Sequence, residues 1–169
     1  MERILQLLNE METQGLILRY AIGGGMAVVF YAPPIMTNDL DIYTLLPPTN
    51  SPIIVLTPLY QFLITHGGQP KGEYVEVDGL PVQFVVAYNE LVEEAIWQAR
   101  EITFGTTKTR VPTAEHLIAI KLQAGRDKDL WHVKLLLEHA TIDEELLNRI
   151  LKRHGLMERW EAFLSAGGR

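Results

Sequence analysis

The spacing of apolar residues changes along the chain, from mixed strand-like and helix-like patterns to a helical pattern alone. The patterns before residue 113 predict helices over 3–14, 26–31, 54–65 and 89–99, strands over 16–22, 38–45, 74–77 and 81–88, and a short hairpin within 102–111. After that point they predict helices over 114–124, 128–139, 143–154 and 157–165. We therefore expect an α/β core over residues 1–112 and a C-terminal helical region over residues 113–169.

Turn and capping residues support several of these boundaries. Gly15 is expected to end the first helix, and Pro33-Pro34 to stop the second. Asp78-Gly79 is a strong signal for a tight turn between two paired strands. Asn89 is suited to cap the helix that follows it.

Composition restricts the class of protein. The 169 residues are 47% hydrophobic, which suits one compact domain or one domain with a short helical annex. No apolar run approaches the roughly 20 residues of a membrane span, and the N-terminus lacks the features of a signal peptide. The chain has no cysteine, which excludes disulfides and thiolate metal sites. We expect a cytoplasmic protein that does not enter membranes.

Charge is spread unevenly over the chain. Residues 1–99 hold 3 basic and 11 acidic residues, whereas residues 100–169 hold 12 basic and 10 acidic residues. One interpretation is an ordinary solvated surface, and the other is an acidic, metal-binding half that faces a basic, phosphate-binding half. The net charge of −6 argues against broad binding of duplex nucleic acid.

Three consecutive glycines, Gly23-Gly24-Gly25, lie between an expected strand and a short helix. Glycines allow positive φ angles and a close approach of the backbone, and amide groups at such a turn can hold phosphate oxygens. A purely structural turn is the alternative.

Asp39 and Asp41 lie two residues apart on an expected strand, so both side chains point to the same face. Two close carboxylates repel each other unless a cation lies between them. Mg²⁺ often binds to one or two carboxylates together with substrate phosphates. The alternative is a strand end with solvated acids.

The order of these features resembles the nucleotidyltransferase fold of DNA polymerase β and its minimal bacterial relatives. The matching stretches are Ala21-Ile22-Gly23-Gly24-Gly25-Met26-Ala27 and Asp39-Leu40-Asp41. The resemblance implies a small mixed sheet flanked by helices. It also implies that the three glycines hold the nucleotide phosphates and that Asp39 and Asp41 bind Mg²⁺ or Mn²⁺.

A second stretch, from Ala119 to Leu130, is similar to the K-L…R-x-K-D-x-x-D pattern of abortive-infection nucleotidyltransferase toxins. Within it, Lys121, Arg126 and Lys128 form a basic cluster. Next to a triphosphate these three side chains would neutralise charge on the β and γ phosphates. Their alternative role is solvation of a helix surface and pairing with nearby aspartates.

The sequence departs from these patterns at two positions. Gln83 lies where relatives carry a third carboxylate, within Gly79-Leu80-Pro81-Val82-Gln83. An amide is a poorer Mg²⁺ ligand and cannot act as a base, and Glu76 on the facing strand is the first candidate to replace it. His132 lies where the toxin pattern has an acid. We expect a surface histidine there, with a proton carrier or a phosphate contact as the alternatives.

Two main functional hypotheses follow. The first is an enzyme that moves a nucleoside monophosphate from an NTP to an unidentified acceptor, which is an RNA, a protein or a small molecule. The second is a catalytically impaired module of the same fold that binds a nucleotide or a partner protein, for example as part of a toxin–antitoxin pair. A structural domain with exposed acids is a third reading, and fold-level analogy cannot choose among them.

Overall fold

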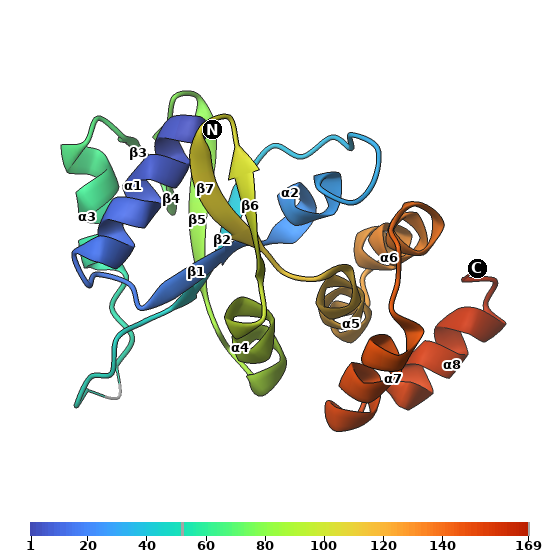
Figure 1. Ribbon diagram of the computed structural model, residues 1–169. Helices are drawn as coiled ribbons and strands as arrows, with labels where there is room; N and C mark the ends of the chain where they lie inside the picture. Colours follow the sequence, from blue (N-terminus) through green and yellow to red (C-terminus); the bar gives the residue numbers. More distant parts are fainter. Residues whose placement is uncertain (52, 169) are drawn as a thin grey trace.

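A mixed five-stranded sheet forms the centre of the fold (Figure 1). The computed structural model describes residues 1–51 and 53–168. The strands lie in the order β1 (Arg19–Ile22), β2 (Leu40–Leu45), β5 (Leu80–Val86), β4 (Tyr74–Val77) and β3 (Gln69–Lys71). β2 and β5 are parallel, and the other neighbouring pairs in this sheet are antiparallel.

The helices lie on both faces of this sheet and beyond one side of it. The elements that pack on the sheet or beside it are α1 (Glu2–Thr13), α2 (Gly24–Val29), α3 (Thr57–Thr65), α4 (Glu90–Trp97) and a hairpin of β6 (Arg100–Phe104) and β7 (Thr107–Val111). The helices α5 (Ala114–Ala124), α6 (Asp127–His139), α7 (Glu144–Arg153) and α8 (Met157–Ser165) follow and lie together, to the right in Figure 1. Within the described ranges, none of these helices has the length and apolar composition needed to cross a bilayer.

β2 and β5 bury one face of the sheet where they pair. The buried residues on one face are Leu40, Ile42, Val82 and Phe84. Because successive side chains of a strand point to opposite faces, Asp41 and Gln83 point to the other face of the sheet. Asp41 and Gln83 therefore lie on the side of the sheet where Gly24 of α2 approaches.

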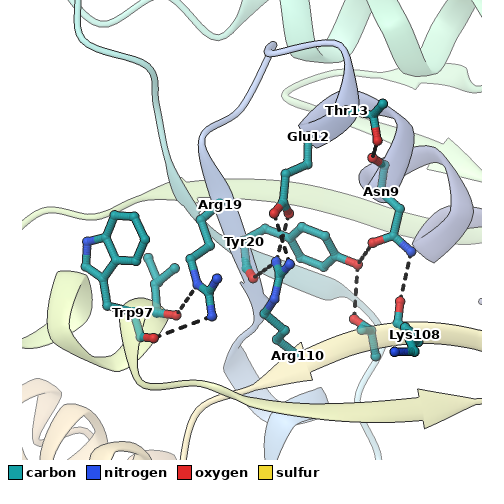
Figure 2. Close-up of polar contacts among 10 residues, drawn as sticks. Asn9, Glu12, Thr13, Arg19, Tyr20, Trp97, Lys108 and Arg110 are labelled. Carbon is teal, nitrogen blue, oxygen red and sulfur yellow. Dashed lines mark hydrogen bonds and ion pairs between the residues drawn. The ribbon is translucent and has the colours of Figure 1, made fainter.

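A polar network fixes the β6–β7 hairpin to α1 and β1 (Figure 2). The guanidinium of Arg110 donates two hydrogen bonds to the carboxylate of Glu12, at 2.8 and 2.9 Å. The buried Tyr20 hydroxyl donates to Asn9 Oδ1 at 2.8 Å, and the Asn9 amide donates to the carbonyl of Lys108 at 2.8 Å. These contacts hold the hairpin against the sheet, so that the chain enters α5 from a fixed position.

Most of the expected elements are present. The helix over 3–14, the hairpin around Asp78-Gly79, the hairpin within 102–111 and the four C-terminal helices are confirmed to within a few residues. Asn89 caps α4 as expected, because its side chain accepts a hydrogen bond from the amide of Val92 at 2.9 Å. The fold class is therefore the predicted one, an α/β core sheet with helices on its faces and a helical C-terminal part.

Several elements differ from the prediction by more than their end residues or were not predicted. The strand expected over 16–22 begins only at Arg19, because the amide of Leu16 donates back to the carbonyl of Met11 and closes the end of α1. The helix expected over 54–65 begins at Thr57, with Pro58 in its first turn. β3 was not predicted, since its polar sequence at the sheet edge has no apolar alternation.

Candidate functional site

The turn between β1 and α2 places three glycines where side chains from other segments approach the backbone. A Cβ atom on Gly23 would lie 2.6 Å from the ring of Tyr43, and one on Gly24 would lie 2.0 Å from Asp41 Oδ2. Gly24 also has a φ of +58°, which favours glycine. At Gly25 a Cβ would lie 3.2 Å from Thr37 Oγ1. The turn therefore requires glycine, because Tyr43, Asp41 and Thr37 lie where its side chains would be.

The two aspartates lie at the start of β2. Asp41 is its second residue, and Asp39 comes just before it. Thr37 Oγ1 lies 3.3 Å from Asp39 Oδ1 and 3.2 Å from the Asp39 carbonyl oxygen, so its hydroxyl can donate to either. Burial, and then the negative charge of Asp39, raise the pKa of Asp41. A cation between the two carboxylates would relieve this repulsion.

Gln83 lies on the strand next to Asp41. The parallel register of β2 and β5 pairs Asp41 with Gln83, so both side chains stand on the same face, and Gln83 is exposed there. Glu76 pairs with Pro81, two residues before Gln83, and therefore shares that face one strand further away. Within the described ranges, however, no three acidic or histidine side chains come together as a metal-binding group.

The basic residues come from the α5–α6 corner. Lys121 is buried on α5, and its Nζ lies 3.2 Å from Asp129 Oδ1. Arg126, at the N-cap of α6, holds the other oxygen of Asp129 through Nε at 2.5 Å. Burial lowers the pKa of Lys121, whereas Asp129 and Asp41 act in the opposite direction. Lys128 is exposed on α6.

These cations lie close enough to Asp41 to affect its carboxyl group. The positive charges of Lys121, Lys128 and Arg126 each oppose the rise in the pKa of Asp41. The glycine turn, the aspartates and the basic corner are therefore one neighbourhood. The expected pairing with nearby aspartates is also present, because Asp129 holds both Lys121 and Arg126.

His132 is not a surface residue, so that expectation is wrong. Its side chain has no exposed surface, and its Cε1 lies 3.7 Å from the position of a Cβ on Gly25. Burial, followed by the charges of Lys121 and Lys128, lowers the pKa of His132 to about 4. The residue faces inward because α6 turns its Asp129, His132, Val133 and Leu136 side toward the rest of the protein.

Sequence reasoning missed three residues that shape this site. Tyr43 packs its buried ring against Gly23, Thr37 orients Asp39, and Asp129 pairs with two cations. Tyr43 continues the period-two spacing of Asp39 and Asp41, so the strand pattern could have revealed it. The sequence gives no comparable signal that Asp129 is buried, because its neighbours Asp127 and Lys128 are exposed and equally polar.

Solved structures of nucleotidyltransferases are similar to this fold. ANT(2'')-Ia in complex with adenylyl-2''-tobramycin is 16% identical, with a TM-score of 0.54 over 93% of this chain and 96% of that chain. An antigenic nucleotidyltransferase-like protein from Paracoccidioides brasiliensis is 14% identical, with a TM-score of 0.55 over 98% of this chain and 90% of that chain. No protein-family model and no curated protein matches the chain. The chain has the nucleotidyltransferase fold, as the resemblance of its motifs predicted.

Proposed function

We propose that this protein is a metal-dependent nucleotidyltransferase, which moves a nucleoside monophosphate from an NTP to an acceptor. The observation that carries the proposal is the fit of the Asp41 carboxylate into the space left by Gly24. This contact joins the carboxylate pair to the turn whose amides can hold phosphate. The cations of the α5–α6 corner lie close enough to Asp41 to oppose the rise in its pKa.

The donor set fits one divalent cation. Asp39 and Asp41 supply carboxylate oxygens, which Mg²⁺ and Mn²⁺ prefer, and phosphate oxygens can complete the coordination. The pKa of Asp41 is raised by burial and then by the negative charge of Asp39, and such a cation would remove the repulsion between the two carboxylates. When bound, the cation would neutralise charge on the triphosphate and so favour departure of pyrophosphate.

The protein's own residues would bind and orient the substrates. We assign the triphosphate to the glycine turn and to Lys121, Arg126 and Lys128. In the reaction the acceptor hydroxyl or amine attacks the α-phosphorus. The new acceptor–phosphorus bond forms as the bond to pyrophosphate breaks, and the acceptor proton is released to solvent. Lys128 is the most available of the three cations, since Lys121 and Arg126 are engaged by Asp129.

Gln83 favours a second candidate function. In the position beside Asp41 an amide can neither take a proton nor hold a second cation as well as a carboxylate. If turnover is absent, the same geometry describes a module that binds a metal–nucleotide complex. Such a module would act as a partner subunit or as a toxin-neutralising protein in a toxin–antitoxin pair.

The proposed reaction limits the acceptor to molecules that carry a hydroxyl or an amine. The structure of ANT(2'')-Ia holds an adenylylated small molecule, tobramycin. For this chain we propose an acceptor among RNA, protein and small molecules that carry a hydroxyl or amine. The exposed sheet face around Gln83 and Glu76 is where we expect it to bind.

Label transfer tests the proposal. The protein is incubated with Mg²⁺ or Mn²⁺, each α-labelled NTP in turn, and a pool of RNA, protein and small-molecule acceptors. We expect label on one acceptor class, and its loss in the Asp39→Asn/Asp41→Asn variant. Lys128→Glu should weaken NTP binding, whereas Lys134→Glu, an exposed change on the same helix, should not. Transfer that survives the loss of both aspartates would contradict the proposal.

A further inference from the structure

The imidazole of His132 is a buried polar group without a hydrogen-bond partner. The side chain has no exposed surface, and neither Nδ1 nor Nε2 has a partner among the described residues. Leaving a buried donor or acceptor unpaired is unfavourable, because the group has lost its hydrogen bonds to water. An apolar ring of similar size would fill this space without that cost, so packing alone does not explain a histidine here.

No described group around His132 makes a hydrogen bond to its ring. α5 contributes Lys121, and α6 contributes Lys128 and, at its N-cap, Arg126, which are all positively charged. Asp129 is the acid that faces the ring, but its two oxygens already accept from Lys121 and Arg126. On the α2 side the ring lies near Gly25, which brings no side chain.

This environment is complementary to an anion. Burial and the neighbouring cations keep the ring neutral, because they lower the pKa of His132 to about 4. A neutral imidazole carries one N–H donor and one bare nitrogen. Lys128 precedes His132 by one helical turn, so the two side chains are neighbours on the same face of α6. An anion that binds to the exposed Lys128 ammonium would therefore lie next to the His132 ring.

We propose that His132 is a ligand of the polyphosphate site and donates a hydrogen bond from its ring N–H to a phosphate oxygen. The ligand class is a triphosphate, bound between the Gly25 backbone and the basic corner. Because the ring is enclosed in the free protein, the hydrogen bond forms when neighbouring side chains move aside and admit a phosphate group beside Lys128. The inference rests on the proposed function for the identity of the triphosphate as an NTP, and on the geometry for the phosphate contact itself.

A phosphate ligand and a purely structural residue differ in what their replacement does to stability and to triphosphate binding. His132→Phe removes the unpaired nitrogens and keeps the ring volume. It should therefore leave the melting temperature of the free protein unchanged or raise it, and weaken triphosphate binding by about tenfold or more. His132→Gln keeps an N–H donor and should lose less affinity. His139→Phe, at an exposed position of the same helix, is the matched control.

Nitrogen NMR of the histidine side chains, with calorimetric affinities, tests the inference on the full chain. The probes are Mg·ATP, the other Mg·NTPs and Mg·tripolyphosphate. The chain has 5 histidines, and the His132 signals are those lost in His132→Phe. We expect the His132 ring nitrogens to shift on addition of tripolyphosphate and of the preferred NTP, and those of His139 to stay.

Different failures separate the two proposals. If an NTP binds with equal affinity to wild type and His132→Phe, the inference is wrong while the proposed function stands. If tripolyphosphate shifts His132 but no NTP binds or is transferred, the phosphate contact stands and the proposed function fails. If neither probe binds nor moves the His132 signals, both are overturned.

Discussion

The carboxylate of Asp41 occupies the space that a side chain on Gly24 would need, because a Cβ there would lie 2.0 Å from Asp41 Oδ2. Gly24 begins α2, and Asp41 lies in β2, the strand that follows α2 in the chain. The backbone of the turn is thereby brought against an acid that is half-buried and has a raised pKa. This contact links the two motifs that the sequence showed only as separate stretches.

Gly24→Ala tests that contact. Positive φ in a non-glycine residue costs about 1–3 kcal/mol, and forcing extra atoms into a packed space costs about as much again. We expect the variant to lose stability by both effects in chemical denaturation. The matched control is Gly155→Ala, because Gly155 has a φ of +67° and nothing within 4 Å of its Cβ position. Equal losses in the two variants would show that Asp41 does not constrain Gly24.

Asp129 pairs with both Lys121 and Arg126, and this group, the Asp129 clamp, should be important for stability. Asp129→Asn leaves the buried Lys121 ammonium without its anionic partner, which typically costs about 3–5 kcal/mol. Asp127→Asn, an exposed change on the same turn of α6, should cost little. Urea unfolding of both variants is the measurement. If the two behave alike, the clamp does not contribute as described.

The same clamp should give an acid-sensitive contribution to stability. Burial alone would raise the pKa of Asp129, but the hydrogen bond from Arg126 and the charge of Lys121 lower it below its ordinary value. A carboxyl group with a lowered pKa stabilises the fold above its unfolded pKa, and this contribution is lost as the pH falls through the folded pKa.

His132 should make the free protein less stable in mild acid. Its pKa in the folded chain, about 4, lies below the ordinary value of 6.5, so the unfolded chain binds more protons between these values. Stability should therefore fall as the pH is lowered from 6.5 to 4, by up to about 3 kcal/mol from this residue. The His132→Phe variant lacks this term, so the difference in unfolding free energy between the two proteins should change with pH over that window. A constant difference would contradict a buried, neutral His132.

Much of the fold could be predicted from the sequence, because apolar spacing and turn residues carry local information. The helices of the C-terminal region and the hairpin at Asp78-Gly79 depend on such short-range patterns. The start of α3 and the edge strand β3 depend on a proline and on pairing with β4, which apolar periodicity does not report. The division of the chain at residue 112 stays a prediction.

The site was only partly visible in the sequence. Asp39, Asp41 and the glycines stand out because period-two spacing and glycine runs are local signals. The burial of His132 and Asp129 depends on how α6 packs against α5 and α2, which is a long-range property. For that reason a surface histidine was expected at a position that is fully enclosed.

Gln83→Asp should restore a third carboxylate beside Asp41, since the two positions are paired in the sheet register. We expect tighter binding of the second divalent cation and an increase in transfer rate of about 10²–10⁴-fold, the usual contribution of a positioned acid–base group. Gln69→Asp, a change to the same residue type at an exposed position of β3, is the control. If wild type binds the nucleotide without transferring it and Gln83→Asp does not transfer it either, the binding-module function is favoured.

Manganese binding tests the central claim most directly, namely that Asp39 and Asp41 hold the metal of an NTP complex. Free Mn²⁺ is measured by electron paramagnetic resonance, with and without a non-hydrolysable analogue of each NTP. We predict that wild type binds Mn²⁺ more tightly when the preferred analogue is present, and that Asp39→Asn/Asp41→Asn does not. Glu73→Gln/Glu158→Gln removes the same charge from exposed positions and should behave as wild type. Nucleotide-linked Mn²⁺ binding that persists in the double aspartate variant would contradict the account.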